Sequence, residues 1–100
     1  MHLKNKFTKT QDKVRECALE EIPSIGIERG LYLIVKGRYL RSVKHSDSEY
    51  TVFICCKKKK LPMTYYGAIE EEHPVGQHIE AFGRVTKVKG VRRFICYSMK

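Results

Sequence analysis

The apolar residues near the N-terminus recur every three to four positions. Val14, Cys17 and Ile22 would share one face of a helix, and Pro23 cannot continue one. The pattern therefore predicts an α-helix over 10–22. We expect this helix to cover one end of a sheet, in preference to binding a partner protein.

After Gly30 the spacing of apolar residues changes to two. Leu31, Leu33 and Val35 alternate with their neighbours, as in a strand with one buried face. Polar turns then divide the remaining chain into hairpins. The pattern predicts five strands, at 31–43, 49–56, 63–66, 78–88 and 91–99.

Gly37 interrupts the first of these strands. A glycine inside a strand commonly marks a bulge or a sharp bend. A bulge at Gly37 shifts the alternation by one residue, so Leu40 is predicted to face the core. Tyr39 and Arg41 are then predicted to face outward.

Two runs of like charge lie between the predicted strands. The four side chains of Lys57–Lys60 repel one another and are predicted to form a solvated loop. Glu70–Pro74 is an acidic connection, too short for more than one turn of helix. The chain therefore has one helix followed by about five strands, which predicts a small all-β domain.

The length of 100 residues fits one domain, and 42% hydrophobic residues argue against a disordered chain. We expect a basic arm at 1–9, the helix at 10–22 and a barrel at 31–99. The apolar run Leu31–Val35 is far shorter than the roughly 18–20 residues that a membrane span needs. No apolar segment follows the basic first residues, so we expect no secretory signal peptide.

Charge narrows the class of partner. Lys and Arg number 20 and Asp and Glu 11, a net charge of +9. Residues 31–69 hold eight basic and two acidic side chains, which is +6 of that total. Such an excess, concentrated on the predicted strands, indicates a polyanionic ligand.

The C-terminal third resembles the closing hairpin of nucleic-acid-binding OB-fold domains. Gly76 opens the predicted fourth strand, Gly83-Arg84-Val85 lies within it, and Gly90 turns the chain into the fifth strand. The resemblance covers 31–99 and implies a five-stranded OB-fold-like barrel preceded by the N-terminal α-helix. Many OB domains place a helix between their third and fourth strands, and Glu70–Pro74 leaves little room for one. An SH3-like barrel therefore stays open as an alternative.

The resemblance implies binding of single-stranded DNA or RNA across the second and third strands and their flanking loops. Cations suit the phosphates, and each base stacked on an aromatic ring contributes roughly 1–3 kcal/mol. Tyr65 and Tyr66 are adjacent in one strand, and so are Arg92 and Arg93, so one member of each pair is expected to face the ligand. The sequence does not say which, and Tyr65 and Arg92 are taken as the candidates. The candidate binding residues are Lys36, Arg38, Tyr39, Arg41, Phe53, Lys57, Lys58, Lys59, Lys60, Tyr65, Phe82, Arg84 and Arg92.

Catalytic and metal chemistry find little support in the sequence. The four cysteines lack the spacing of a zinc knuckle and are too few for a disulfide scaffold, so we expect buried, reduced thiols. Glu70–Glu72 is a solvated cluster without the set distances that acid–base work requires. No phosphate-binding glycine loop is present. We expect no enzyme activity, no cofactor and no metal.

The preferred function is largely sequence-independent binding of single-stranded DNA, with RNA left open. The alternative is a protein–protein adaptor whose barrel docks an acidic partner. Attachment to an anionic membrane through Lys57–Lys60 is the weakest of the three, because Leu61 and Met63 make a thin apolar anchor. We also expect an intracellular protein, cytoplasmic or nucleoid-associated, with a replication or recombination protein or a second copy of the chain as partner.

Overall fold

A computed structural model describes residues 12–69 and 73–100. Its strands are β1 (Lys13–Cys17), β2 (Leu31–Ser46), β3 (Glu49–Cys56), β4 (Lys59–Tyr66), β5 (His78–Val88) and β6 (Val91–Met99). The bounds of β3, β5 and β6 are those predicted from the sequence. No helix in this described part is long and apolar enough to cross a membrane.

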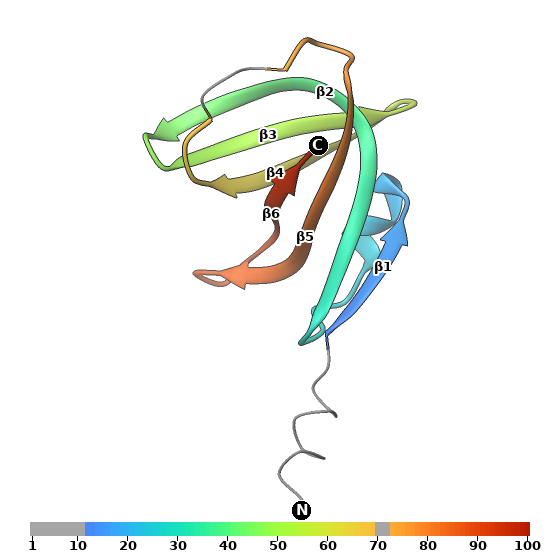
Figure 1. The fold of residues 1–100 in the computed structure, drawn as a ribbon. Coiled ribbons are helices and arrows are strands. Elements are labelled where there is room, and N and C mark those ends of the chain that lie inside the picture. Colours follow the sequence, from blue (N-terminus) through green and yellow to red (C-terminus); the bar gives the residue numbers. More distant parts are fainter. Residues whose placement is uncertain (1–11, 70–72) are drawn as a thin grey trace, which may run out of the picture.

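Strands β2 to β6 form a closed barrel (Figure 1). β2, β3 and β4 pair as an antiparallel meander, and β4 then pairs in parallel with β6. β6 pairs antiparallel with β5, and β5 closes the barrel onto the first half of β2. This strand order is that of an OB-fold, which confirms the expected five-stranded barrel.

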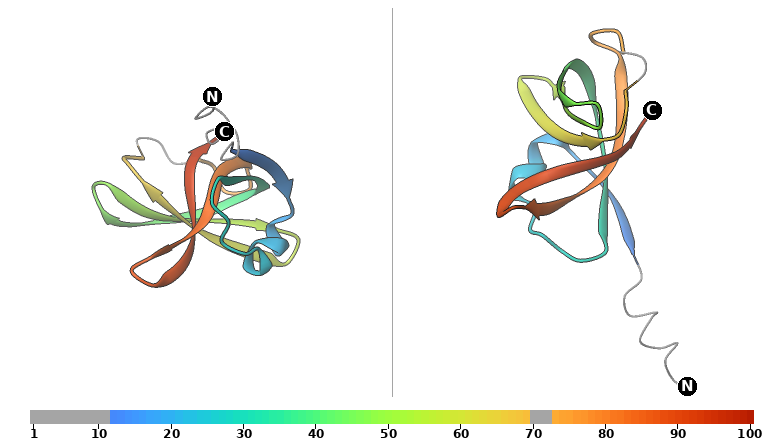
Figure 2. Two further views of the ribbon diagram at one scale, coloured as in Figure 1. Left: turned by 90° about the horizontal axis from the view of Figure 1, so that it is seen from below. Right: turned by 90° about the vertical axis from the view of Figure 1, so that its left-hand side faces the viewer.

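The predicted N-terminal α-helix is wrong. Within the described residues, β1 pairs in parallel with β2 over Leu31–Val35, and the short 3-10 helix η1 (Leu19–Ser24) follows (Figure 2). Val14 is 57% exposed, so it does not belong to the apolar stripe that suggested a helix. The strand hydrogen bonds offered by the edge of β2 outweigh a weak local helix preference. The predicted arm at 1–9 lies outside the described residues.

η1 still performs the covering role expected of that helix. Leu19 and Ile22 are buried in the core, and η1 packs mainly on β4. The Glu21 carboxylate accepts a hydrogen bond of 2.7 Å from the backbone N–H of Ala18, which caps the start of η1.

The bulge in β2 lies at Leu40, not at Gly37. The pairing with β3 shifts between Tyr39 and Arg41, so inward alternation runs unbroken through Gly37 to Tyr39. Tyr39 is only 4% exposed, and its hydroxyl lies 3.1 Å from the Ser42 Oγ. The expected outward position of Tyr39 is therefore wrong. Gly37 is needed for close approach, since a Cβ there would lie 2.9 Å from the Cys55 carbonyl oxygen.

The lysine run is shorter as a loop than predicted. Lys57 and Lys58 form a two-residue turn, with Lys57 at φ 57°, and Lys59 and Lys60 begin β4 opposite Cys56 and Cys55. All four lysines are exposed. The β3–β4 hairpin thus carries a cluster of positive charge at its tip.

Candidate nucleic-acid interface

The strand register gathers outward side chains of β2, β3 and β4 into rows. Directly opposed residues point to the same side of a sheet, and the buried residues Tyr39, Ile54 and Leu61 define the inward side. We call the resulting outer surface the β2–β4 face. Its rows are Arg38–Cys55–Lys60, Arg41–Phe53–Pro62 and Val43–Thr51–Thr64. Thr64 has the outward register but is only 5% exposed.

Phe53 and Arg41 form the centre of the β2–β4 face. The Arg41 guanidinium carbon lies 4.6 Å from the centroid of the half-buried Phe53 ring, in cation–π contact. The interaction holds a charged group and an aromatic group side by side. These nine residues include three cations, and the next row adds one carboxylate, Glu49 opposite Tyr66. Cations therefore outnumber carboxylates, and the surface favours an anionic ligand.

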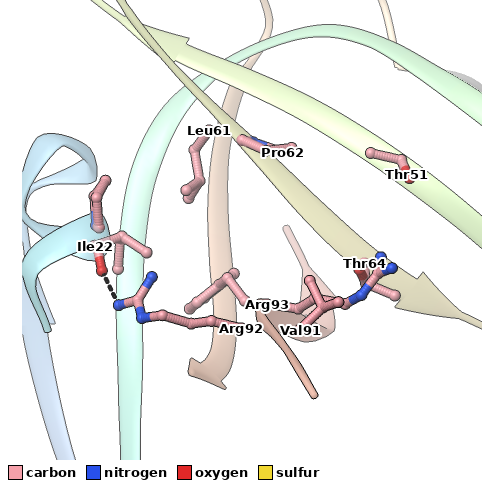
Figure 3. A pocket seen from close by; sticks show the side chains of 10 residues that line it. Ile22, Thr51, Leu61, Pro62, Thr64, Val91, Arg92 and Arg93 are labelled. Atoms are coloured by element: carbon pink, nitrogen blue, oxygen red, sulfur yellow. Dashed lines mark hydrogen bonds between the residues drawn. The ribbon is translucent and has the colours of Figure 1, made fainter. Parts of the chain in front are cut away.

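A cavity of about 340 Å³ borders the face where β4, β6 and η1 meet (Figure 3). Thr51, Pro62 and Thr64 line it from the face, and Arg93 lines it from β6. The Arg93 Nη1 donates a hydrogen bond of 3.4 Å to the Thr64 Oγ1. Arg93 thus adds a fourth cation at the edge of the face.

Arg92 makes contacts within the fold that the sequence did not predict. Its Nη2 donates to the carbonyl oxygens of Ile22 and Ile25, the latter at 2.5 Å, and so fastens the end of η1 to β6. Figure 3 shows this contact with Ile22. The sequence could not choose between Arg92 and Arg93 because the choice depends on where η1 lies.

The tyrosine pair is resolved in the same way. Tyr65 is half-buried and packs against the core, in the inward phase of the fully buried Met63. Tyr66 is 49% exposed and lies opposite Glu49, at the end of the face. The more exposed aromatic of the pair is therefore Tyr66, a choice that the sequence left open.

Phe82 and Arg84 lie on another side of the barrel. Phe82 stacks on Tyr32 of β2, with ring centroids 5.5 Å apart and an interplanar angle of 11°, and also contacts Tyr97. Arg84 pairs with Ile95, and Ile95 with Thr64, so Arg84 is two strands from the face. Within the described residues its buried Nε has no hydrogen-bond partner. The predicted grouping of Phe82 with Phe53 is not found.

The remaining candidates belong to the row Arg38–Cys55–Lys60 or lie next to it. Lys36 is exposed and forms an ion pair of 3.5 Å with Glu16 of β1. Arg38 donates a hydrogen bond of 3.4 Å to the Gly76 carbonyl oxygen, which leaves the rest of its guanidinium exposed. Lys57, Lys58 and Lys59 extend beyond Lys60 at the tip of the β3–β4 hairpin.

The candidate residues chosen from the sequence leave out Arg93 and five of the nine face residues: Val43, Thr51, Cys55, Pro62 and Thr64. The sequence predicts that the third strand begins at Met63, because Pro62 disfavours a strand before it. In the structure, β4 begins at Lys59 and includes Pro62. Alternation in the sequence already places Thr51 on the same side as Phe53. The 5% exposure of Thr64 depends on tertiary packing, which alternation does not predict. Among residues 12–69 and 73–100 no group of three or more metal-ligating side chains occurs.

Comparisons with solved structures show the fold. A chain of a Replication Protein A heterotrimer bound to ssDNA matches with a TM-score of 0.68 and 7% identity, over 89% of this chain and 80% of that chain. A chain of the S. pombe Stn1-Ten1 complex matches with a TM-score of 0.53 and 11% identity, over 69% of this chain and 56% of that chain. Entamoeba histolytica asparaginyl-tRNA synthetase matches with a TM-score of 0.65 and 14% identity, over 90% of this chain but 23% of that chain.

Sequence comparison adds no relative. No protein-family model matches the chain, and no curated protein matches it significantly. At identities of 7–14% the structural matches establish a shared barrel fold.

Proposed function

We propose that this protein binds single-stranded nucleic acid, and ssDNA in particular, across the β2–β4 face. The observation that carries the proposal is the Arg41–Phe53 pair at the centre of a surface on which cations outnumber carboxylates. The Replication Protein A chain, solved with ssDNA, and the Stn1-Ten1 chain share the barrel fold. This likeness supports nucleic-acid binding in general.

Each part of the face has a role in this proposal. Arg38, Lys60 and Arg93 neutralise phosphates, and the lysines at the hairpin tip extend that contact. Phe53 offers its ring to a base, and Arg41 holds the ring in place. Phosphates are common to every sequence and any base can stack, so binding is largely independent of sequence.

The preference for single strands follows from the aromatic group. A base in a duplex already stacks on its neighbours, so Phe53 can reach a base face only in an unpaired strand. Duplex then keeps the phosphate contacts and loses the stacking contact. The proposal contains no catalytic step.

We place the protein inside the cell, where its four free thiols would stay reduced. A protein partner in replication or recombination belongs to the same proposal. The Replication Protein A and Stn1-Ten1 chains both come from multiprotein assemblies, which supports such a partner.

The test is a panel of labelled oligomers of about 20 nucleotides, dT, rU and duplex, at about 50 and 200 mM salt. We expect dT to bind more tightly than duplex, with affinity falling by a slope of about −0.7 per phosphate contacted. Lys60→Gln should reduce that slope, whereas Lys87→Gln on β5 should not. A flat titration at low salt would contradict the proposal and favour the adaptor function.

A further inference from the structure

A second cavity, of about 480 Å³, lies where β2, β3 and β5 meet and adjoins the first row of the β2–β4 face. Three cationic side chains line it, those of Lys36, Arg38 and Lys57. Two adjacent thiols, Cys55 and Cys56, line it as well. The cavity therefore combines positive charge with two nucleophiles.

The register fixes where Cys55 stands among these cations. On the outer surface Cys55 lies directly between Arg38 of β2 and Lys60 of β4. Gly37 also lines the cavity, and its missing side chain lets β2 pass close to β3 at this point. Cys55 is half-buried and Cys56 is exposed.

Most of the positive charge here is uncompensated. Glu16 pairs with Lys36 at 3.5 Å. Across the described residues no carboxylate forms an ion pair with Arg38 or Lys57. The cavity thus attracts small anions to the neighbourhood of the two thiols.

The other two cysteines differ in burial and charge. Burial raises the pKa of the Cys96 thiol to about 12. Burial and the nearby Glu21 carboxylate raise the pKa of Cys17. Because the thiolate is the nucleophile, both thiols should react slowly at neutral pH. Cys17 and Cys96 therefore serve as internal controls for the reaction rates of the two cavity thiols.

We propose that this basic cavity admits small anionic disulfides, of which oxidised glutathione is an example, and that Cys55 forms a mixed disulfide there. The adduct would block the β2–β4 face, a consequence that rests on the proposed function. Cys55 is a modification site in this account, and its adduct is a reversible switch for nucleic-acid binding.

The exchange is balanced without a further oxidant. Cys55 loses its proton to solvent, and its thiolate attacks one sulfur of the disulfide. A new S–S bond forms, the old S–S bond breaks, and the second half of the reagent leaves as a thiolate that takes up a proton. The adduct places bulk and carboxylates between Arg38 and Lys60, where a phosphate would otherwise lie. A reducing thiol restores the free Cys55.

Reaction rates test the site without any use of nucleic acid. The reduced full chain is incubated with oxidised glutathione or with cystamine, a cationic disulfide, and the modified cysteines are mapped by mass spectrometry. We expect glutathione to modify Cys55 several-fold faster than Cys17 or Cys96, with a rate that falls as salt rises. Cystamine should lose that preference. Lys57→Gln should slow glutathione, and Lys87→Gln should not.

Single-cysteine variants separate the two neighbours. Cys56→Ser should keep the adduct and Cys55→Ser should lose it. Modification of Cys56 alone, equal rates with both reagents, or a disulfide-linked dimer in place of the adduct would overturn the proposal.

Oligonucleotide binding tests the switch. The glutathione adduct should bind a dT oligomer at least ten-fold more weakly than the reduced protein, and reduction should restore binding. Cys55→Ser should bind equally with and without the reagent. If the reduced protein binds no oligomer, the proposed function fails while the rate test still decides the site. If reduced and modified proteins bind equally, the switch fails.

Discussion

At the scale of single residues, the account depends on the contact between Arg41 and Phe53. Arg41 and Phe53 face each other across β2 and β3, so the cation–π contact follows from the register at the bulge. Phe82 has equal aromatic area, but Tyr32 and Tyr97 contact its ring on another wall of the barrel. Aromatic content alone therefore does not define a binding residue.

Replacing Phe53 by Ala should weaken dT binding about five-fold or more, since one stacked base contributes roughly 1–3 kcal/mol. Phe82→Ala is the matched control. It should lower thermal stability through lost aromatic packing and leave affinity nearly unchanged. Fluorescence anisotropy on folded samples checks both variants, and an equal loss of affinity in Phe82→Ala would contradict the assignment.

Cys96 should make stability depend on alkaline pH. Its pKa is raised to about 12 in the folded chain from an ordinary value of 9.0, so the folded state retains its proton longer. The free energy of unfolding should then fall as pH rises above about 9, by at most about 1.4 kcal/mol per pH unit from this group. Urea unfolding of the parent and of Cys96→Ala across that range tests this, and parallel curves would refute it.

At the scale of elements, η1 and β6 depend on each other. η1 covers the end of the barrel with Leu19 and Ile22, and Arg92 of β6 donates to the two carbonyl groups that end η1. Its neighbour Arg93 points to the cavity beside β4. Alternation along one strand thus assigns one arginine to folding and the next to the surface.

Arg92→Ala should destabilise the protein by about 1–3 kcal/mol, because two carbonyl oxygens lose a charged donor. Arg93→Ala should cost little stability and should reduce both oligonucleotide affinity and its salt slope. Urea unfolding and an oligomer titration on the two variants separate these effects. The reverse pattern would mean that the roles of the two arginines are exchanged.

Gly83 marks a point where strands β5 and β6 come too close for a side chain. A Cβ at Gly83 would lie 2.0 Å from the Ile95 carbonyl oxygen, which is backbone and cannot rotate away. Gly83→Ala should therefore destabilise the barrel by about 1–3 kcal/mol or more. Gly26→Ala, with open space around its Cβ, is the control and should change the melting temperature little.

At the scale of the whole molecule, alternation predicted most of the barrel. The bounds of β3, β5 and β6 follow from period-two patterns bounded by turns. The N-terminal segment escaped prediction because its strand is defined by pairing with the start of β2, Leu31–Val35, and not by a pattern within the segment itself. The inward position of Tyr39 escaped because the bulge falls three residues after the glycine that suggested it.

Part of the candidate surface was also predicted, because alternation within the strands assigns side chains to the outer surface. Arg38, Arg41, Phe53 and Lys60 come together on the β2–β4 face, as outward residues of known strands do. Arg93 and Tyr66 required the phase of β4 and β6, and the separation of Phe82 from Phe53 required the closed barrel. Residue type gave the chemistry, and register decided which side chains share a surface.

The most direct measurement is an NMR titration of the isotope-labelled protein with a short dT oligomer at low salt. The account predicts that the largest shift changes fall on the β2–β4 face, at Arg41, Phe53 and Thr64, with little change at Tyr32, Phe82 and Tyr97. Changes centred on that second group, or no changes at all, would contradict it.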